Sequence, residues 1–495
     1  MARTEYLTAP LKTDRMPPGV PFIISNEAAE RFSFYGMNSI LVPFMTTWLR
    51  DSHGNLALMS DATANAWYHA FASAVYGLCI VGAVLSDAFI GKFRTVVALS
   101  IVYCFGHFAL AADHTWLGLL GGMALIAFGA GGIKPCVSAM VGDQFGARNQ
   151  HLLARVYSWF YFSINLGSAF STLLMPWLLE PYKAIPGPGG MPPGGYERFL
   201  ERIHSPDVAF GIPGLFMMIA TIVFWLGRKK FVHIPPSRQR FVAEFFNVDA
   251  FRASKGRPNQ TLARRIAESL NRETLKILGN LLIPVPFVAM FWALWQQNFS
   301  SWVEQAMRMD RHLFNREWLP GQIQTVNPVF ILLMLPLFSY IIYPMINRVF
   351  RLTPLRKIGA GLFLATFAFL IVGWIQTRID SGQTPHIGWQ LLAFVVLTAG
   401  ETMVSPTHLE FAYTQAPRRL KSLVMCTYLL AISLGNQFTA VVNALIKGGE
   451  LHLAGASYFF FFVIVMFITA FLFVFFARFY RGKTYIQDSG EALPA

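Results

Sequence analysis

Long apolar runs alternate with short polar segments over almost the whole chain. Each run is about 20 residues or longer, which is the length that an α-helix needs to cross the hydrocarbon core of a bilayer. The pattern predicts twelve spans, six on each side of a long hydrophilic segment. They are expected at residues 20–48, 62–86, 95–112, 116–141, 152–178, 208–228, 281–303, 326–347, 357–377, 388–411, 421–444 and 457–477.

The hydrophilic segment between Gly227 and Gly279 is rich in Lys and Arg. Residues 261–278 place apolar side chains at helical spacing with charges between them, which predicts an amphipathic helix at the membrane surface. A solvated linker helix and a regulatory helix both fit this pattern. The predicted organisation is a tail at 1–19, a helical bundle at 20–228, a basic linker at 229–280, a second bundle at 281–478 and a tail at 479–495.

Lys and Arg also concentrate in the short loops on one side of the predicted spans. These residues are Lys92, Arg94, Arg148, Arg155, Arg348, Arg351, Arg356, Lys357, Arg418, Arg419 and Lys421. Because cytoplasmic loops carry such an excess, this side and both termini are expected to be cytoplasmic. Residues 181–195, rich in Pro and Gly, are expected to form an irregular loop on the opposite side. The first 18 residues lack the apolar core of a cleavable signal.

Composition supports a membrane protein over a soluble one. Hydrophobic residues make up 54% of the chain and charged residues 13%, and the mean hydropathy is +0.45. A net charge of +14 can indicate a nucleic-acid partner, but here Lys and Arg lie between apolar runs. The four cysteines lie in or beside apolar stretches without paired spacing, which predicts buried thiols. We therefore expect an all-α integral membrane protein on the plan of the major facilitator transporters, two six-helix bundles joined by a cytoplasmic linker.

Ionisable residues within the first span are the first candidates for chemistry, since each costs about 2.5–3.5 kcal/mol at mid-helix unless it has a partner or a wet cavity. Glu27, Arg31 and Tyr35 follow one another at intervals of four residues and share a helix face, with Glu30 beside them. Two carboxylates and one guanidinium leave a surplus acid, and burial near another acid favours its protonated form. The group predicts a proton site; the alternative is that these charges anchor the helix start at the membrane interface.

Three further spans carry ionisable residues. Lys134 follows the small residues 129–132, which allow close helix approach; alternatively it snorkels to the interface. Glu401 lies too deep for its carboxylate to reach either interface, which favours a functional role over a structural one. His69, beside Tyr68, titrates nearer neutral pH than a carboxylate, and either transfers protons or is hydrogen-bonded packing.

Cations in the first half and an acid in the second half suit a ligand that has a carboxylate at one end and an ammonium at the other. Arg31 and Lys134 provide the cations and Glu401 the acid. A zwitterionic peptide fits this description.

Several motifs resemble those of the proton-dependent oligopeptide transporter family of the major facilitator superfamily. Residues 27–36 resemble the family's E-x-x-E-R-F-x-Y-Y-G, with Phe34 in place of the first Tyr, and residues 82–92 resemble the superfamily's loop between helices two and three. Further similar motifs lie at residues 131–135, 142–145, 160–168, 291–294, 327–328, 400–401, 405–406, 416–417 and 421–422.

The resemblance implies a proton-coupled symporter that imports di- and tripeptides by alternating access. It implies a monomeric, multi-pass protein of the bacterial inner membrane that is no enzyme and needs no metal or cofactor besides protons. Arg31 and Lys134 would lie near the peptide carboxylate and Glu401 near its amino group. The pocket would be lined by Tyr35, Tyr68, Asn165, Trp292, Asn327 and Tyr428, proton coupling would involve Glu27, Glu30, Arg31 and His69, and Asp87, Lys92 and Arg94 would form a gating loop.

The chain also departs from the family's pattern. Gln296 and Gln297 stand where many members carry an acid on helix seven, and His69 resembles a histidine of animal members that could compensate. Tyr428 stands where a Trp is common, and residues 228–280 are too polar to supply the two extra helices of many bacterial members. The same fold with another cargo, such as nitrate or another metabolite, and a non-transporting membrane sensor are the alternatives.

Overall fold

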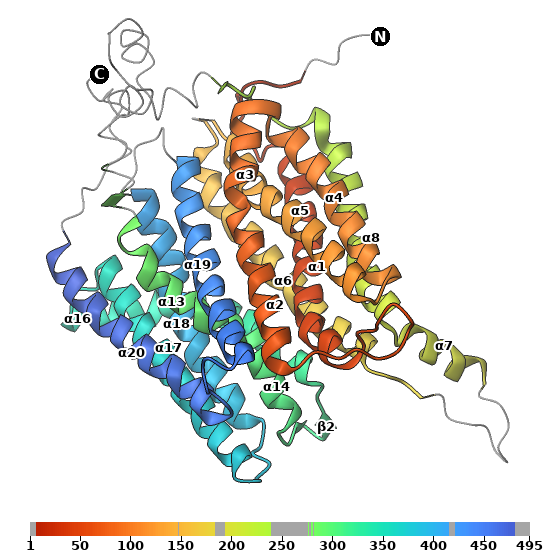
Figure 1. Ribbon diagram of the computed structural model, residues 1–495. Helices are drawn as coiled ribbons and strands as arrows, with labels where there is room; N and C mark the ends of the chain where they lie inside the picture. Colours follow the sequence, from red (N-terminus) through yellow and green to blue (C-terminus); the bar gives the residue numbers. More distant parts are fainter. Residues whose placement is uncertain are drawn as a thin grey trace, which may run out of the picture.

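The computed structural model describes residues 6–146, 148–183, 194–238, 276, 279–280, 282–414 and 421–480. Its helices form two groups that lie side by side (Figure 1). The first bundle contains α1 (Val20–Thr47), α2 (Asp61–Gly77), α3 (Cys79–Val84), the π-helical η1 (Leu85–Ile90), α4 (Lys92–Ala112), α5 (Trp116–Asp143), the short η2 (Gln150–Leu152), α6 (Leu153–Leu179), α7 (Gly195–Ile203), α8 (Pro206–Leu226) and η4 (Gly227–Lys229).

The second bundle is interrupted more often. It contains α13 (Val285–Trp295), η5 (Gln296–Phe299), α14 (Ser301–Met307), the strands β1 (His312–Leu313) and β2 (Arg316–Glu317), η6 (Pro320–Thr325), α15 (Val326–Leu337), η7 (Phe338–Ile342), α16 (Tyr343–Val349), α17 (Pro354–Asp380), α18 (Gly388–Thr414), α19 (Lys421–Gly448) and α20 (Ala456–Phe479). The strands form an antiparallel hairpin.

Every predicted span overlaps a helix or an interrupted helix, so the prediction of a helical membrane protein is confirmed. Nine helices among the described residues are long and apolar enough to cross a membrane. The other three predicted spans are α1, the stretch from α13 to α14, and α18. These three carry buried polar side chains, among them Glu30, Gln297 and Glu401. Candidate chemistry is not confined to these three spans, because α2 with His69 and α5 with Lys134 are among the nine.

Helix starts follow local capping rules. The hydroxyl oxygens of Ser60, Ser205 and Thr353 accept hydrogen bonds from the backbone N–H three residues later and so begin α2, α8 and α17. Gly91, with φ +84°, separates η1 from α4. This left-handed conformation favours glycine because it has no Cβ.

Several predicted segments fall outside the described residues. These are most of the linker, including all but residue 276 of the predicted amphipathic helix, residues 184–193 of the irregular loop, the motif at 416–417 and the tail from 481 onward. Two elements were not predicted: α7, in which no residue is buried, and the hairpin β1–β2.

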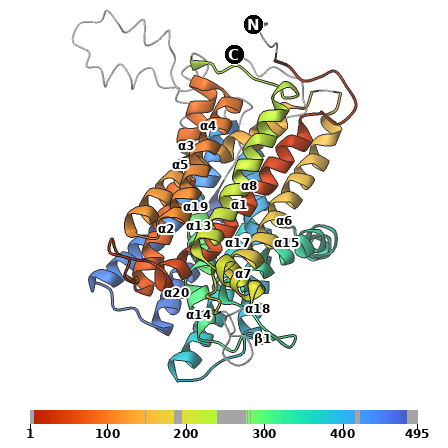
Figure 2. The same ribbon diagram turned by 90° about the vertical axis from the view of Figure 1, so that its right-hand side faces the viewer.

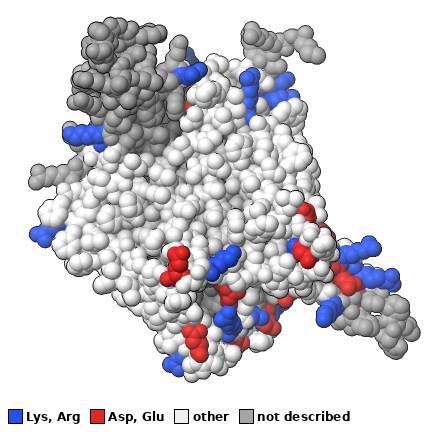
Figure 3. Space-filling view, viewed as in Figure 1, with Lys and Arg blue, Asp and Glu red and all other residues white. Residues whose placement is uncertain are grey.

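The two ends of the bundles are named here by their residues. One end, called the Gly91 end after the residue between η1 and α4, holds the starts of α1 and α4, and the other, the hairpin end, holds α14 and β1–β2 (Figures 1 and 2). On the face shown in Figure 3, Lys, Arg, Asp and Glu gather near these two ends, and the broad band between them is uncharged. This distribution is the one that a bilayer around the middle of the bundles requires.

The predicted close approach of small residues is confirmed at the crossing of α3 and α5. A Cβ atom added to Gly82 would lie 2.3 Å from the Cα atom of Gly132. A second tight crossing brings α19 against α13, where a Cβ on Gly435 would lie 2.2 Å from the Ala289 carbonyl oxygen. Small residues at such crossings let helix backbones pack directly in a membrane.

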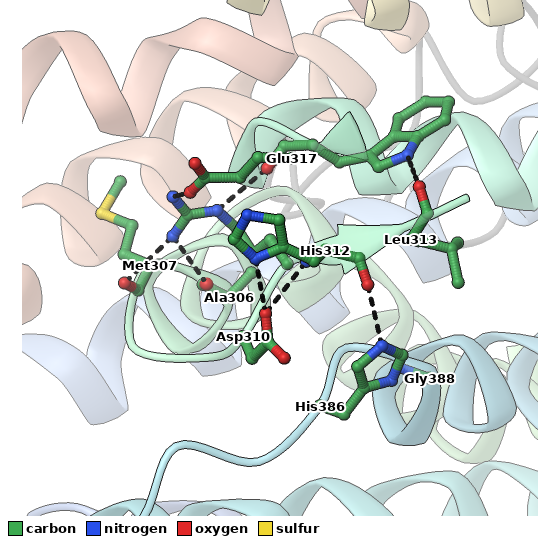
Figure 4. Close-up of polar contacts among 10 residues, drawn as sticks. Ala306, Met307, Asp310, His312, Leu313, Glu317, His386 and Gly388 are labelled. Carbon is green, nitrogen blue, oxygen red and sulfur yellow. Dashed lines mark hydrogen bonds and ion pairs between the residues drawn. The ribbon is translucent and has the colours of Figure 1, made fainter. Parts of the chain in front are cut away.

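Polar contacts hold the hairpin against the second bundle (Figure 4). Arg311 Nε donates to the Trp318 carbonyl oxygen at 2.9 Å, and its Nη2 pairs with Glu317 at 2.5 Å. His386, just before α18, donates from Nε2 to the His312 carbonyl oxygen at 2.8 Å. The hairpin is thus fixed to the start of α18.

Candidate functional site

Four charged residues of the first bundle form one buried group, the first-bundle cluster: Glu27, Glu30, Arg31 and Lys134. Arg31 Nε lies 2.7 Å from Glu27 Oε1 and 3.3 Å from Glu30 Oε2. Lys134 Nζ lies 3.3 Å from Glu30 Oε1. Glu30, only 1% exposed, is therefore shared between two cations, and the cluster holds two acids and two bases.

Lys134 reaches this cluster from the middle of α5 and is 7% exposed. Its ammonium also lies 4.0 Å from the centre of the Phe34 ring and 5.8 Å from that of Tyr76. Aromatic faces attract cations, so these rings support a charge that snorkelling would have removed from the bundle.

Glu401 forms the opposite pole, in α18 of the second bundle, and is 9% exposed. Its Oε2 accepts hydrogen bonds from Trp295 Nε1 at 2.7 Å and from Asn327 Nδ2 at 2.8 Å. Asn327 also donates to Thr398 Oγ1 at 3.1 Å. No Lys or Arg among the described residues forms an ion pair with Glu401, so its donors are neutral.

Aromatic rings connect the two poles. The Tyr35 ring, one turn beyond Arg31, stacks on Phe299 of η5 with 6.0 Å between ring centres, and Phe299 lies 5.8 Å from the Trp295 ring. Trp295 in turn donates a hydrogen bond to Glu401. The structure therefore brings the predicted cations and the predicted acid to the same region between the bundles.

The remaining predicted pocket residues differ in their surroundings. Trp292 packs edge-on against Tyr428, with 6.0 Å between ring centres, and the Tyr428 hydroxyl bonds to Ser405 Oγ at 2.7 Å. Tyr68 is fully buried and its hydroxyl has no hydrogen-bond partner among the described residues. Asn165 donates within its own helix, to the Tyr161 carbonyl oxygen at 2.9 Å.

His69 joins the bundles instead of facing the charged groups. Nδ1 lies 2.9 Å from Asn436 Oδ1 in α19, and Nε2 lies 3.0 Å from Ser300 Oγ, just before α14. Since an amide oxygen accepts, Nδ1 carries a proton, which leaves Nε2 of the neutral ring to accept from Ser300.

His69 belongs to a series of contacts that we call the cross-bundle ladder. Asp61, Asn65, His69 and Ser73 are spaced by four and share a face of α2, and they bond to Arg308, Glu304, Ser300 and Ser433 respectively. The lengths of these four bonds are 3.2, 3.0, 3.0 and 2.8 Å. The ladder closes the hairpin end along α2.

The predicted gating loop lies at the Gly91 end. Lys92 Nζ pairs with Asp143 Oδ2 of α5 at 2.7 Å, whereas the Asp87 carboxylate accepts from Ser86 Oγ at 3.2 Å. Arg94 is exposed. Lys92 thus connects the loop to the end of α5.

Sequence reasoning missed several partners. Trp295 follows Trp292 by one turn. A second tryptophan in an apolar run does not indicate that its indole N–H donates a hydrogen bond to Glu401. Asn436 and Ser300 are uncharged and lie far from His69 in sequence. Glu304 did carry a signal in the sequence, because it is an acid directly after the predicted seventh span.

A cavity of about 760 Å³ lies elsewhere, between α1, α6 and α8. Its lining is mostly apolar, with Phe32, Phe170 and Trp177 among the larger side chains, and it contains none of the predicted site residues. We therefore do not assign the site to it.

Comparisons with known proteins agree with one another. Residues 93–458 match the profile of the POT family. The human protein "Solute carrier family 15 member 2" is 34% identical over 414 residues, which cover 79% of this chain and 53% of the relative. "Peptide transporter family 1" of Drosophila melanogaster is 36% identical over 383 residues, covering 74% and 48%. The chain thus spans about half the length of the curated relatives it matches.

A solved structure is similar along nearly the whole chain. The crystal structure of an "auto inhibited POT family peptide transporter" superposes with a TM-score of 0.78 at 32% identity, covering 96% of this chain and 99% of that one. The similarity confirms the predicted fold class, a major facilitator transporter.

Proposed function

Because this chain belongs to the POT family, we propose that it is a proton-coupled symporter that imports di- and tripeptides by alternating access. The observation that carries the proposal is the contrast between its two poles. The first-bundle cluster supplies two cations to a peptide carboxylate. Glu401, which has no cationic partner among the described residues, supplies an acid to the peptide ammonium. A zwitterion with separated termini complements both poles.

Coupling would run through the shared acid Glu30. A proton that neutralises Glu30 or Glu27 weakens the attraction of that acid for Arg31 and Lys134. Both cations then bind the peptide carboxylate at less cost, because the peptide no longer competes with two anions. Rocking of the bundles would release peptide and proton together on the other side.

The driving force is sufficient for accumulation. A membrane potential of about 100 mV contributes about 2.3 kcal/mol for each proton moved. This free energy corresponds to a roughly fiftyfold concentration ratio for a neutral zwitterion. One or two protons per cycle would sustain import.

The topology proposed with this function puts the Gly91 end in the cytoplasm, because the Lys- and Arg-rich loops lie there. The hairpin end then faces the periplasm of a bacterial inner membrane, and the cross-bundle ladder is the gate on that side. The protein would act as a monomer, use protons as its coupling ion and have no enzymatic activity.

Dialanine uptake into liposomes tests this proposal, with and without an inward proton gradient. The variants are Glu30→Gln, Glu401→Ala and, as an exposed-acid control, Glu450→Gln. We expect gradient-driven accumulation in the native protein and in the control. Glu30→Gln should lose accumulation but retain counterflow exchange, because its binding site remains. Glu401→Ala should lose both.

Absence of peptide uptake and exchange under any gradient would refute the proposed cargo. Nitrate and other small metabolites would then be tested on the same liposomes. Failure of all of them would favour a sensor.

A further inference from the structure

The second rung of the ladder, between Asn65 and Glu304, contains an acid that the mechanism above does not use. We infer that Glu304 binds a proton and that its protonation closes the hairpin end of the bundles. This inference rests on the proposed function, since it gives a proton entering from the hairpin end a place to act. The side chain lies in α14, directly after the buried residues of η5.

The contact has an unusual geometry. Asn65 Nδ2 lies 3.0 Å from both Oε1 and Oε2 of Glu304, so one amide nitrogen serves both carboxyl oxygens. Asn65 is 3% exposed, and its Oδ1 atom is buried without a hydrogen-bond partner among the described residues. A buried acceptor without a donor costs about 1–3 kcal/mol.

A proton on Glu304 would satisfy this acceptor. Rotation of the Asn65 amide about its Cβ–Cγ bond would place Nδ2 and Oδ1 each opposite one carboxyl oxygen. The protonated acid then donates to Oδ1 while its other oxygen accepts from Nδ2. The result is a two-bond reciprocal pair across the bundles, which the carboxylate form cannot make.

Among the described residues, no Lys or Arg forms an ion pair with Glu304. Arg308, which lines the same cavity as Glu304, pairs with Asp61 at 3.2 Å, and Asp61 itself repels a second anion. Asn65 and Glu304 line this cavity of about 330 Å³, which Tyr458 of α20 also lines. Asp380 of α17 accepts hydrogen bonds from Gln376 Nε2 and from the Ala456 N–H. His69, one turn inward on α2, is occupied by Ser300 and Asn436.

The direction of the effect follows from linkage. Closing the hairpin end packs Glu304 against Asn65 and withdraws it from water, which favours the protonated form. If the closed state binds the proton more tightly, the proton must favour the closed state by the same factor. Low pH on the hairpin side therefore closes this end, and high pH opens it.

Distances between spin labels at the hairpin end test the inference without any substrate. Labels on Ser52→Cys and Thr384→Cys, both exposed and on different bundles, report closure in lipid nanodiscs. The four native cysteines are buried, which limits background labelling. The native protein should shift its closed-to-open ratio by about five- to thirtyfold between about pH 5 and pH 8, the effect expected of one or two hydrogen bonds.

Three variants make the assignment specific. Glu304→Gln imitates the protonated acid and should stay closed at both pH values. Asn65→Leu removes the partner and should stay largely open at both. Glu450→Gln, an exposed acid at the same end, should respond to pH as the native protein does.

Two results would overturn the inference: a native protein without a pH response, or a Glu304→Gln variant that keeps the full response. If either result is obtained with a protein that takes up peptide, the proposed function stands and only this gate is refuted. Loss of the pH response in Glu304→Gln, in a protein that takes up no peptide, supports the gate and refutes the cargo.

Discussion

Glu30 in the first bundle and Glu401 in the second are both buried carboxylates, but they are neutralised differently. Glu30 is shared between Arg31 and Lys134, each at 3.3 Å. Within the part of the chain that the structure describes, Glu401 accepts hydrogen bonds from the neutral donors Trp295 and Asn327. The first-bundle cluster is balanced within itself, whereas the charge of Glu401 is left for a ligand or a proton to balance.

This difference predicts which of the two poles is stable without a ligand. A buried ion pair survives because each charge offsets the burial cost of the other, and removing one member leaves the other uncompensated. A buried carboxylate whose donors are neutral is already uncompensated, so its burial already costs free energy. Substitutions at the two poles should therefore affect stability in opposite directions, although both impair transport.

The largest effect is expected for Lys134→Ala. Glu30 loses one of its two cations, and breaking a buried pair in this way costs about 3–5 kcal/mol. We expect a clear fall in the thermal unfolding temperature in detergent and no measurable dialanine uptake.

The double variant Glu30→Gln with Lys134→Met distinguishes charge balance from general damage. Removing both charges should restore most of the thermal stability while uptake stays absent. If the double variant is as unstable as Lys134→Ala, the cluster is not balanced in the way described.

Glu401→Gln should have a smaller effect on stability and the opposite sign. The amide oxygen still accepts from Trp295 and Asn327, and the uncompensated buried charge disappears. We expect an unchanged or higher unfolding temperature. Loss of a charged hydrogen bond to the peptide ammonium, worth about 1.5–3 kcal/mol, should lower uptake efficiency by about ten- to a hundredfold. A fall in stability as large as that of Lys134→Ala would contradict the comparison.

The sequence predicted the two poles because charges inside apolar runs are rare and costly. Glu27, Arg31 and Glu30 lie on adjacent turns of one helix, so their contact follows from helical spacing. The partners of Glu401 and His69 could not be predicted, because they are neutral residues on other helices. Their contacts depend on how the bundles pack, and no periodicity within one helix encodes that packing.

His69→Leu extends the comparison to contacts between the bundles. The change removes bonds to Ser300 and Asn436 and leaves both without that partner. We expect a five- to thirtyfold shift toward the open hairpin end, equivalent to about 1–2 kcal/mol, measured with the Ser52 and Thr384 labels. Ser73→Ala is the matched control: Ser433 still donates to the Ser73 carbonyl oxygen. An equal shift in both variants would show that His69 has no special part in closure.

Asp310 is a solvent-exposed acid and so contrasts with the buried Glu401. Its substitution is expected to have the smallest effect. Hydrogen bonds from the His312 ring and its backbone N–H lower the pKa of Asp310 below its ordinary value. A lowered pKa means that these bonds stabilise the hairpin above the unfolded pKa and are lost as the pH falls through the folded one. Protection of the His312 amide from exchange, relative to an unstructured peptide at the same pH, should therefore fall only in acid, and Asp310→Asn should abolish that fall. Uptake at neutral pH should not change in this variant, because water already solvates the acid and no transport step requires its charge. A loss of uptake comparable to that of Glu401→Gln would mean that burial is not what separates the two acids.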